Sequence, residues 1–172
     1  MFSKKAEYAL RATIYIAQKA SEEKKIGLRE IANAIDSPKS FTAKILQILT
    51  GNKKIVSSMH GPNGGFFITE KAKKLPVRAV LEAVHEDSVL TKCILGLKEC
   101  SEINPCPMHA EYKAIRARLT ELFEKKTIKK LADEISKGKL SINNRKIRSP
   151  IKKSPNYGRQ NEAKHSENSC NQ

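Results

Sequence analysis

Two short amphipathic helices joined by a tight turn constrain the fold of this chain more than any other stretch. Residues 28–35 place apolar side chains at positions i, i+3, i+4 and i+7, and residues 38–49 place a second apolar face at helical spacing. Between them, Asp36-Ser37-Pro38 offers a helix-capping residue followed by proline at the first helical position. The pattern predicts a helix-turn-helix. A helical hairpin that packs only to form a core has the same periodicity, so this alternative stays open.

A glycine-rich hairpin is predicted directly after the two helices. Residues 55–60 and 66–69 are β-prone runs, and the five residues between them read GPNGG. A hairpin in this position is a wing, whose glycines allow the backbone to approach a phosphate chain or a DNA groove. A tight turn without a ligand is the plainer interpretation. The candidate DNA-contacting residues, on the polar face of the second helix and on the wing, are Lys39, Ser40, Lys44, His60, Gly61 and Gly64.

The charge of the chain indicates the class of partner. Its net charge is +15 and its pI is about 9.8, which favours nucleic acid and, second to it, an anionic membrane surface. The chain has no run of 18 or more apolar residues, and its first residues, MFSKKAEYAL, do not resemble a signal peptide. We therefore expect a cytoplasmic protein without a membrane partner.

Three of the four cysteines form a cluster that predicts a metal site. Cys93, Cys100 and Cys106 have the spacing C-x6-C-x5-C, and His109 follows at C-x2-H. A disulfide framework needs an even number of cysteines and an oxidising compartment. Thiolates together with an imidazole suit an iron–sulfur cluster or zinc, and both remain open on spacing alone.

A long helix is predicted after the cysteines, from residue 107 to about 126, with Cys106 as its N-cap. Its apolar residues Tyr112, Ile115, Leu119 and Leu122 step by 3, 4 and 3, which is an a/d seam of about two heptads. The seam fits packing within one subunit or against a second copy. Because winged DNA-binding domains usually pair on two-fold sites, we expect a homodimer.

The expected fold class is mainly α with a small β-hairpin: a winged helix-turn-helix plus a long dimerisation helix. Residues 1–74 are predicted to form the DNA-binding domain, and residues 75–137 the cysteine sensor loop and dimerisation helices. Residues 138–172 are basic, with few apolar side chains and no periodicity, and are predicted to be a disordered tail. The tail either adds salt-sensitive affinity for DNA or is simply solvated.

The order of these elements resembles a known family. The helix KAEYALRATIYIA, the helix-turn-helix, the wing VSSMHGPNGGFFIT and the three cysteines ahead of a long helix are similar to the bacterial winged-helix regulators typified by IscR and NsrR, over about residues 1–137. The resemblance implies a homodimer that binds a double-stranded DNA operator. It also implies an iron–sulfur cluster, with [2Fe-2S] favoured over [4Fe-4S].

Individual roles follow from the same resemblance. Cys93, Cys100 and Cys106 match the cluster ligands, although the first gap is one residue longer than in the two named types. His109 matches the fourth ligand of the IscR type, and Glu7 matches the carboxylate that the NsrR type supplies across the dimer.

The DNA-reading positions match only in part. Ser40 and Lys44 fall where the IscR type contacts base edges, whereas Ala43 stands where that type has a glutamate that selects among operators. His60 replaces a wing arginine that enters the minor groove. The operator sequence therefore does not carry over from the relatives.

The sequence thus predicts a DNA-binding transcriptional regulator whose DNA affinity is controlled by an iron–sulfur cluster at the three-cysteine loop. The alternatives are a winged-helix regulator with a structural zinc, or one in which the thiols act directly as a redox switch. An enzyme is not expected, because the chain has no phosphate-binding glycine motif and no nucleophile elbow.

Overall fold

Helix α1 (Lys4–Lys19) is the central element of the fold in the computed structural model, which describes residues 2–51, 55–98, 100–138 and 141–143. The Ser3 hydroxyl caps the helix by accepting a hydrogen bond of 3.2 Å from the Ala6 amide. The face of α1 that points into the protein is lined mostly by small side chains, which lets neighbouring helices approach closely. The buried residues are Ala6, Ala9, Ala12, Thr13, Ile16 and Ala17.

The predicted helix-turn-helix is present and packs against α1. Helix α2 (Leu28–Ile35) ends at Asp36, which adopts the left-handed conformation with φ of 55°. Helix α3 (Lys39–Gly51) follows, and the Thr42 hydroxyl donates a 3.0 Å hydrogen bond to the Pro38 carbonyl at its start. The apolar faces expected from the periodicity are the buried ones in both helices.

The wing consists of β1 (Ser57–Met59) and β2 (Gly65–Phe67), paired antiparallel with Ser58 opposite Phe66. Both strands are shorter than predicted, because the flanking residues Ile55, Val56 and Ile68 turn into the core instead of extending the ladder. A third segment joins the wing through Ile26, which exchanges two backbone hydrogen bonds of 2.9 and 3.1 Å with Phe66. The residue pattern around Ile26 does not predict this bridge.

The last described helix returns to the winged body. Helices α4 (Glu70–Lys73) and α5 (Arg78–Ala83) follow the wing, and α7 (Ile128–Ser136) packs against α1, where Ile128 and Ala132 join the main core. One core therefore contains side chains from both sides of residue 74. The predicted division of the chain at that residue remains a proposal about function.

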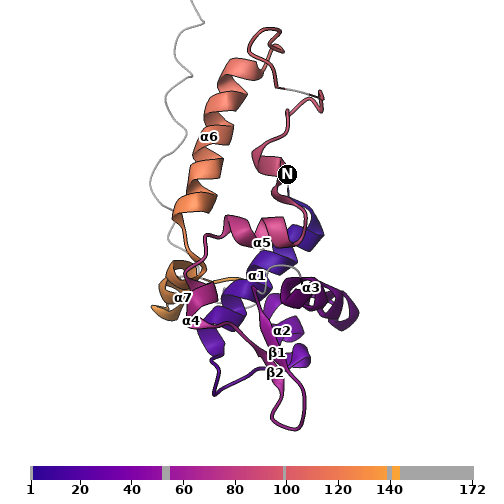
Figure 1. The fold of residues 1–172 in the computed structure, drawn as a ribbon, viewed down its shortest axis with the longest axis vertical. Helices are drawn as coiled ribbons and strands as arrows, with labels where there is room; N and C mark the ends of the chain where they lie inside the picture. The colour runs from indigo at the N-terminus through magenta and orange to yellow at the C-terminus, as the bar shows by residue number, and fades with distance from the viewer. Residues whose placement is uncertain (1, 52–54, 99, 139–140, 144–172) are drawn as a thin grey trace, which may run out of the picture.

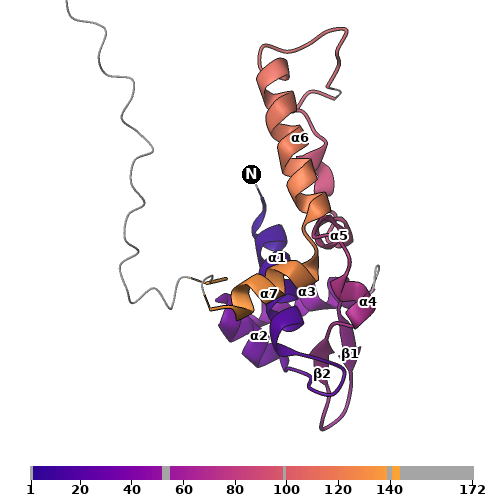
Figure 2. The ribbon, with the colours of Figure 1, turned by 90° about the vertical axis from the view of Figure 1, so that its left-hand side faces the viewer.

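Helix α6 (His109–Lys125) stands away from this body and extends the molecule along its long axis (Figures 1 and 2). Its second half packs against the body, where Leu119 and Phe123 cover a small second core next to the short helix η1 (Asp87–Leu90). The helix begins two residues later than predicted. The Cys106 carbonyl accepts a 2.9 Å hydrogen bond from the His109 amide in a three-residue turn, and Met108 is the N-cap, so the predicted cap at Cys106 is wrong.

The fold class expected from the sequence, mainly helical with one small antiparallel hairpin, is confirmed. Within the described part of the chain, no helix is long and apolar enough to cross a membrane. The predicted disordered tail lies, from residue 144 onward, outside the described residues, and so does Cys170.

Gly65 should be essential for the wing. Its φ of +152° is rarely adopted by other residues, and a Cβ there would lie 2.7 Å from the Ile26 carbonyl oxygen. We expect Gly65→Ala to destabilise the protein by about 2 kcal/mol and to lower Tm by about 5 °C in calorimetry at fixed protein concentration. Gly51→Ala is the matched control, because a Cβ at Gly51 meets nothing within 4 Å. Equal melting of both variants would contradict the prediction.

Candidate metal centre and nucleic-acid interface

The loop between η1 and α6 is held at its start by side chains of α6. The Arg116 guanidinium donates hydrogen bonds to the carbonyls of Thr91 (3.0 Å) and Lys92 (3.4 Å), and the Thr120 hydroxyl donates to the Leu90 carbonyl (3.3 Å). These bonds fix the segment immediately before Cys93 against the helix. The remainder of the loop, up to Met108, carries all three candidate ligand thiols.

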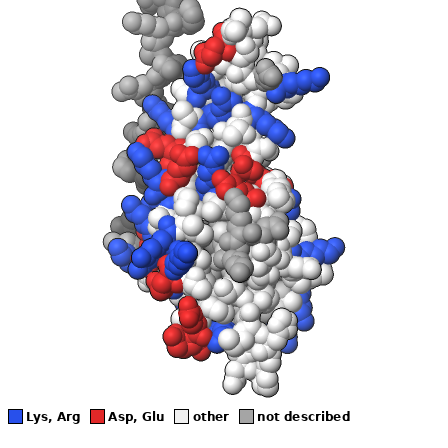
Figure 3. Space-filling view, in the orientation of Figure 1, with Lys and Arg blue, Asp and Glu red and all other residues white. Residues whose placement is uncertain are grey.

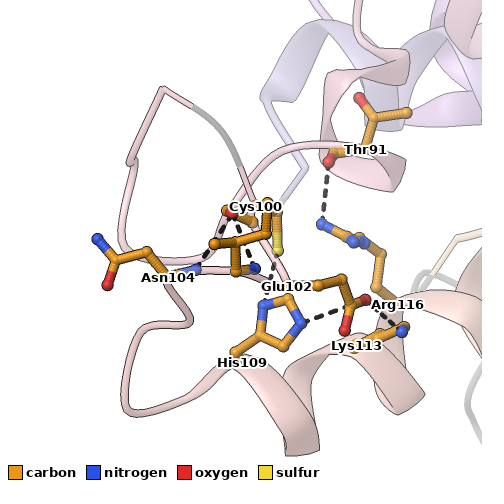
Figure 4. A network of polar contacts seen from close by, with 9 residues as sticks. Thr91, Cys100, Glu102, Asn104, His109, Lys113 and Arg116 are labelled. Atoms are coloured by element: carbon orange, nitrogen blue, oxygen red, sulfur yellow. Dashed lines mark hydrogen bonds and ion pairs between the residues drawn. The ribbon is translucent and has the colours of Figure 1, made fainter.

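Cys100 and His109 form the first half of the candidate metal centre. The Cys100 Sγ lies 3.3 Å from the Nδ1 of His109, whose side chain is buried at the start of α6 (Figure 4). On the other side of the ring, Nε2 lies 3.5 Å from a carboxylate oxygen of Glu102, and this buried nitrogen has no hydrogen-bond partner among the described residues. Glu102 itself is paired with Lys113. His109 therefore has one ring nitrogen directed at a thiol and the other directed at a carboxylate.

Cys93 and Cys106 form the second half, at the two ends of the loop. The pKa of the Cys93 thiol is lowered, chiefly by the backbone N–H of Leu95 and further by the side chain of Cys106, while burial opposes the shift. The positive charge of Arg116 also lowers this pKa. A lowered pKa favours the thiolate, which is the form that binds metal. A cavity of about 200 Å³ beside Cys93 leaves space for a ligand at this half.

The four donors fit an iron–sulfur cluster in type but are arranged as two pairs. All three cysteines of the loop are free thiols. Among residues 2–51, 55–98, 100–138 and 141–143, no three His, Cys, Asp or Glu side chains are arranged to hold one metal ion. Buried His109, with Nδ1 at a thiol and Nε2 3.5 Å from the Glu102 carboxylate, fits a ligand histidine whose ring is oriented by a carboxylate. Assembly of a complete site therefore requires the loop to bring its two pairs together.

Glu7 lies on α1, where it is paired with its own helix. Its carboxylate is 2.8 Å from the Lys4 Nζ and 3.8 Å from an Arg11 nitrogen. The hydrogen bond from Lys4 is the main cause that lowers the pKa of Glu7, so the side chain is an anion at neutral pH. Its assignment as a metal ligand depends on a second subunit and remains a proposal.

The predicted DNA-contacting residues are placed on the exposed surface of α3 and the wing. Lys39, Ser40 and Lys44 are exposed on α3, and His60 and Gly61 are exposed on the wing. The wing tip, at the bottom of Figure 3, shows no charged side chain on this face.

Gly64 has a structural reason to be glycine. A Cβ at this position would lie 2.3 Å from the Met59 carbonyl oxygen, so the tight turn of the wing excludes any side chain there. Its predicted role as a DNA contact remains a proposal, beside this requirement of the turn itself.

Two residues near the candidate metal centre were not found from the sequence. Arg116 anchors the loop, and Glu102 faces His109, but neither belongs to a periodic pattern or to a ligand spacing. Glu102 lies two residues after Cys100, and a carboxylate beside a ligating histidine commonly orients the ring. This proximity is the one sequence signal that could have indicated it.

Comparison with known proteins identifies the family. Residues 2–134 match the Rrf2 family, described as iron-dependent transcriptional regulators. The chain belongs to this family. It is 29% identical over 133 residues to a protein of Aquifex aeolicus named as an HTH-type transcriptional regulator, covering 76% of this chain and 90% of the relative.

A second relative and a solved structure agree with this result. IscR of Klebsiella pneumoniae is 29% identical over 129 residues, covering 75% of this chain and 77% of the relative. The fold matches that of CymR, the global cysteine regulator of B. subtilis, with a TM-score of 0.63 at 19% identity, covering 78% of this chain and 97% of that one. The protein is therefore a DNA-binding transcriptional regulator of the Rrf2 family.

Removal of the Arg116 side chain should loosen the start of the loop. We expect Arg116→Ala to speed amide hydrogen exchange in residues 91–98 by about threefold to tenfold, because two hydrogen bonds from a charged group to backbone carbonyls are lost. Arg118→Ala, which removes an exposed arginine from the same helix, is the control and should leave this exchange unchanged. Identical exchange in both variants would mean that Arg116 does not hold the loop.

Proposed function

We propose that this protein is a homodimeric transcriptional regulator whose affinity for its operator is set by an iron–sulfur cluster bound at Cys93, Cys100, Cys106 and His109. The observation that carries the proposal is the pair formed by Cys100 and buried His109 at the start of α6, with the Glu102 carboxylate on the other side of the ring. The description of the family as iron-dependent and the relatives named IscR support it.

We favour a [2Fe-2S] cluster over a [4Fe-4S] cluster, because His109 matches the fourth ligand of the IscR type. A cluster bound there would be held by the three thiolates and one weaker ligand. Glu7 of a second subunit is the alternative fourth ligand, and its ion pairs with Lys4 and Arg11 would have to open first.

The chain contributes by bringing its two pairs of candidate ligands together into one site. Convergence of Cys93 and Cys106 with Cys100 and His109 orders the loop against the first turn of α6. The start of the loop is already tied to α6 through Arg116, so the ordered loop restricts η1 and α5 beneath it. An order–disorder element of this kind changes the relative positions of two recognition helices in a dimer.

The second candidate function is a direct thiol redox switch. The Cys106 side chain helps to lower the pKa of the Cys93 thiol, which favours a disulfide between these two residues when a peroxide accepts the two electrons and is reduced to water or alcohol. A structural zinc bound by the same cysteines and His109 is the other alternative. The cluster, the disulfide and the zinc would all form in the same loop. They differ in the group that joins its cysteines.

The exposed face of α6 supports the homodimer. The predicted seam is divided: Leu119 packs within its own chain, whereas Ile115 and Leu122 are 61% and 51% exposed. Met108, which is 44% exposed, precedes Ile115 by seven residues, as Ile115 precedes Leu122, so the three form one apolar stripe. Such a stripe on a long helix suits pairing with the same helix of a second copy.

The remaining assignments follow from this function. Residues 1–74 read the operator through Lys39, Ser40 and Lys44 of α3 and through the wing at His60, Gly61 and Gly64. Residues 75–137 supply the sensor loop and the dimer helix. A regulator of this kind acts on the DNA of the cytoplasm and is not expected to be an enzyme.

The cluster should be visible and should change DNA binding. We expect protein purified without oxygen to be red-brown and to contain iron and sulfide, and the triple change of Cys93, Cys100 and Cys106 to Ala to be colourless. Fluorescence anisotropy on a duplex enriched from a random library should show altered affinity for the triple variant. A colourless native protein with stoichiometric zinc would contradict the cluster, and unchanged affinity would contradict its regulatory role.

The same spectra distinguish the two candidate fourth ligands. His109→Ala should shift the visible spectrum and speed cluster loss if His109 is the ligand, whereas Glu7→Ala should do so if the carboxylate is. His85→Asn is the control, because His85 is exposed and its left-handed backbone conformation is tolerated by Asn. If neither variant differs from this control, the fourth ligand lies elsewhere.

The stripe on α6 should determine the oligomeric state. We expect the double variant Ile115→Asp, Leu122→Asp to weaken the dimer at least a hundredfold in sedimentation equilibrium, because two charges would be buried in an apolar seam. Ala117→Asp places a single carboxylate at an exposed position on the opposite side of α6 and should leave the dimer intact. A dimer that survives the double variant would show that α6 does not form the interface.

A further inference from the structure

Met59 is an exposed large hydrophobic side chain on the wing. It ends strand β1 and is 52% exposed. Among the described residues, the other exposed large hydrophobic side chains all lie between residues 94 and 122, on the cysteine loop and α6. A single exposed methionine is not unusual by itself. Its meaning therefore depends on what surrounds it on the wing.

The neighbouring strand leaves Met59 uncovered because a glycine stands opposite it. Met59 pairs with Gly65 in the register of the hairpin, and directly opposite residues are the ones whose side chains contact each other across two strands. Gly65 has no room for a side chain, since a Cβ there would lie 2.7 Å from the Ile26 carbonyl oxygen. The close approach of Ile26 to the wing thus keeps Met59 without a side-chain neighbour on the opposite strand.

The backbone around Met59 is held at the tip and at the base of the hairpin. At the tip, the Gly64 amide donates a 2.9 Å hydrogen bond to the Gly61 carbonyl, and a Cβ at Gly64 would lie 2.3 Å from the Met59 carbonyl oxygen. At the base, the Val56 amide donates a 3.2 Å hydrogen bond to the Leu49 carbonyl in the last turn of α3. The wing therefore projects from the body while tied to α3 (Figures 1 and 2).

The wing has no lysine or arginine with which to hold a DNA phosphate. Residues 55–69 contain no Lys, Arg, Asp or Glu, although charged residues make up 30% of the chain. The face of the wing tip seen in Figure 3 is correspondingly uncharged. Lysine and arginine supply the salt-dependent part of DNA affinity. This segment must therefore contribute through shape, hydrogen bonds and apolar contact.

We propose that Met59 is an apolar wedge that enters the minor groove beside the bases read by α3 and partly unstacks one base step. Its unbranched, polarisable side chain adapts to irregular surfaces, and methionine is among the side chains that minor-groove proteins insert between bases. The wedge rests on the proposed operator binding and adds a residue to the predicted wing contacts His60, Gly61 and Gly64. It selects for deformability, because a flexible pyrimidine–purine step unstacks more readily than a stiff A-tract.

The test replaces the apolar side chain with a polar one of similar length, Met59→Gln. Binding is measured by fluorescence anisotropy from 50 to 200 mM KCl, on a duplex enriched from a random library and on a scrambled duplex of equal length. We expect affinity for the enriched duplex to fall about tenfold, and affinity for the scrambled duplex to fall less than about threefold. The slope of log K against log salt should stay unchanged, because no phosphate contact is removed.

Two further variants are matched controls. Ser58→Gln places the same side chain at the neighbouring exposed position, on the other face of the strand, and should leave affinity unchanged. Met59→Leu keeps an apolar wedge and should retain affinity for the enriched duplex within about threefold. Melting temperatures of all variants are compared with that of the native chain, and we expect them to be equal because both positions are exposed.

Bending of the DNA gives a readout that a purely structural role of Met59 would not change. An inserted wedge kinks the duplex toward the major groove. Energy transfer between dyes at the two ends of the enriched duplex should therefore rise when the native chain or Met59→Leu binds. We expect saturating Met59→Gln to lose most of this rise.

The outcomes separate the wedge from the proposed function. A native chain that selects no duplex from the library would overturn operator reading and the wedge together. An enriched duplex that Met59→Gln binds and bends as the native chain does would overturn the wedge alone. A weaker dimer of Met59→Gln in sedimentation equilibrium, with unchanged DNA binding, would also overturn the wedge, in favour of contact with a second copy.

Discussion

The close packing of small side chains along α1 is the constraint on which the rest of the structure depends. Ala6, Ala9 and Ala12 are completely buried, so α2, α3, α5 and α7 can approach the same helix from different directions. A larger side chain at any of these alanines would meet a densely packed interior, where overpacking commonly costs 1–3 kcal/mol. The helix-turn-helix and the base of α6 are therefore not two independent modules. They share one central helix.

Helix α1 connects the candidate sensor loop to the helix-turn-helix through direct contacts. At the start of α1, the Phe2 ring lies 5.4 Å from the Phe123 ring of α6, and Lys5 forms a 3.1 Å ion pair with Glu86 next to η1. Further along α1, Arg11 caps the end of α2. A displacement of α6 or η1 by the cysteine loop therefore bears directly on the helix that supports α2 and α3. In the proposed mechanism, these packed contacts would couple the cysteine loop to α2 and α3.

The elements that could be predicted are those whose signal is local. The buried faces of α2 and α3 repeat every turn, and the GPNGG loop marks the wing, so these features followed from the sequence. The bridge between Ile26 and Phe66 and the return of α7 to α1 depend on contacts between distant residues and have no periodic signature. The seam of α6 could be predicted only in part. The sequence shows four residues at coiled-coil spacing. It does not show that Leu119 packs within the chain while Ile115 and Leu122 remain exposed.

The division of the cysteine loop into two pairs has a consequence for how such a sensor is tuned. The additional residue in the first gap falls in a segment where the Gly96 amide donates a 3.0 Å hydrogen bond to the Cys93 carbonyl and Gly96 adopts a positive φ of 72°. One extra residue in the gap adds well under about 0.6 kcal/mol to the entropy of loop closure. The free energy needed to order the loop is instead set by its contacts. Exposed Ile94, Leu95 and Ile103 contribute little in the single chain, so in the proposed mechanism a partner subunit or a bound cluster would supply the stabilisation.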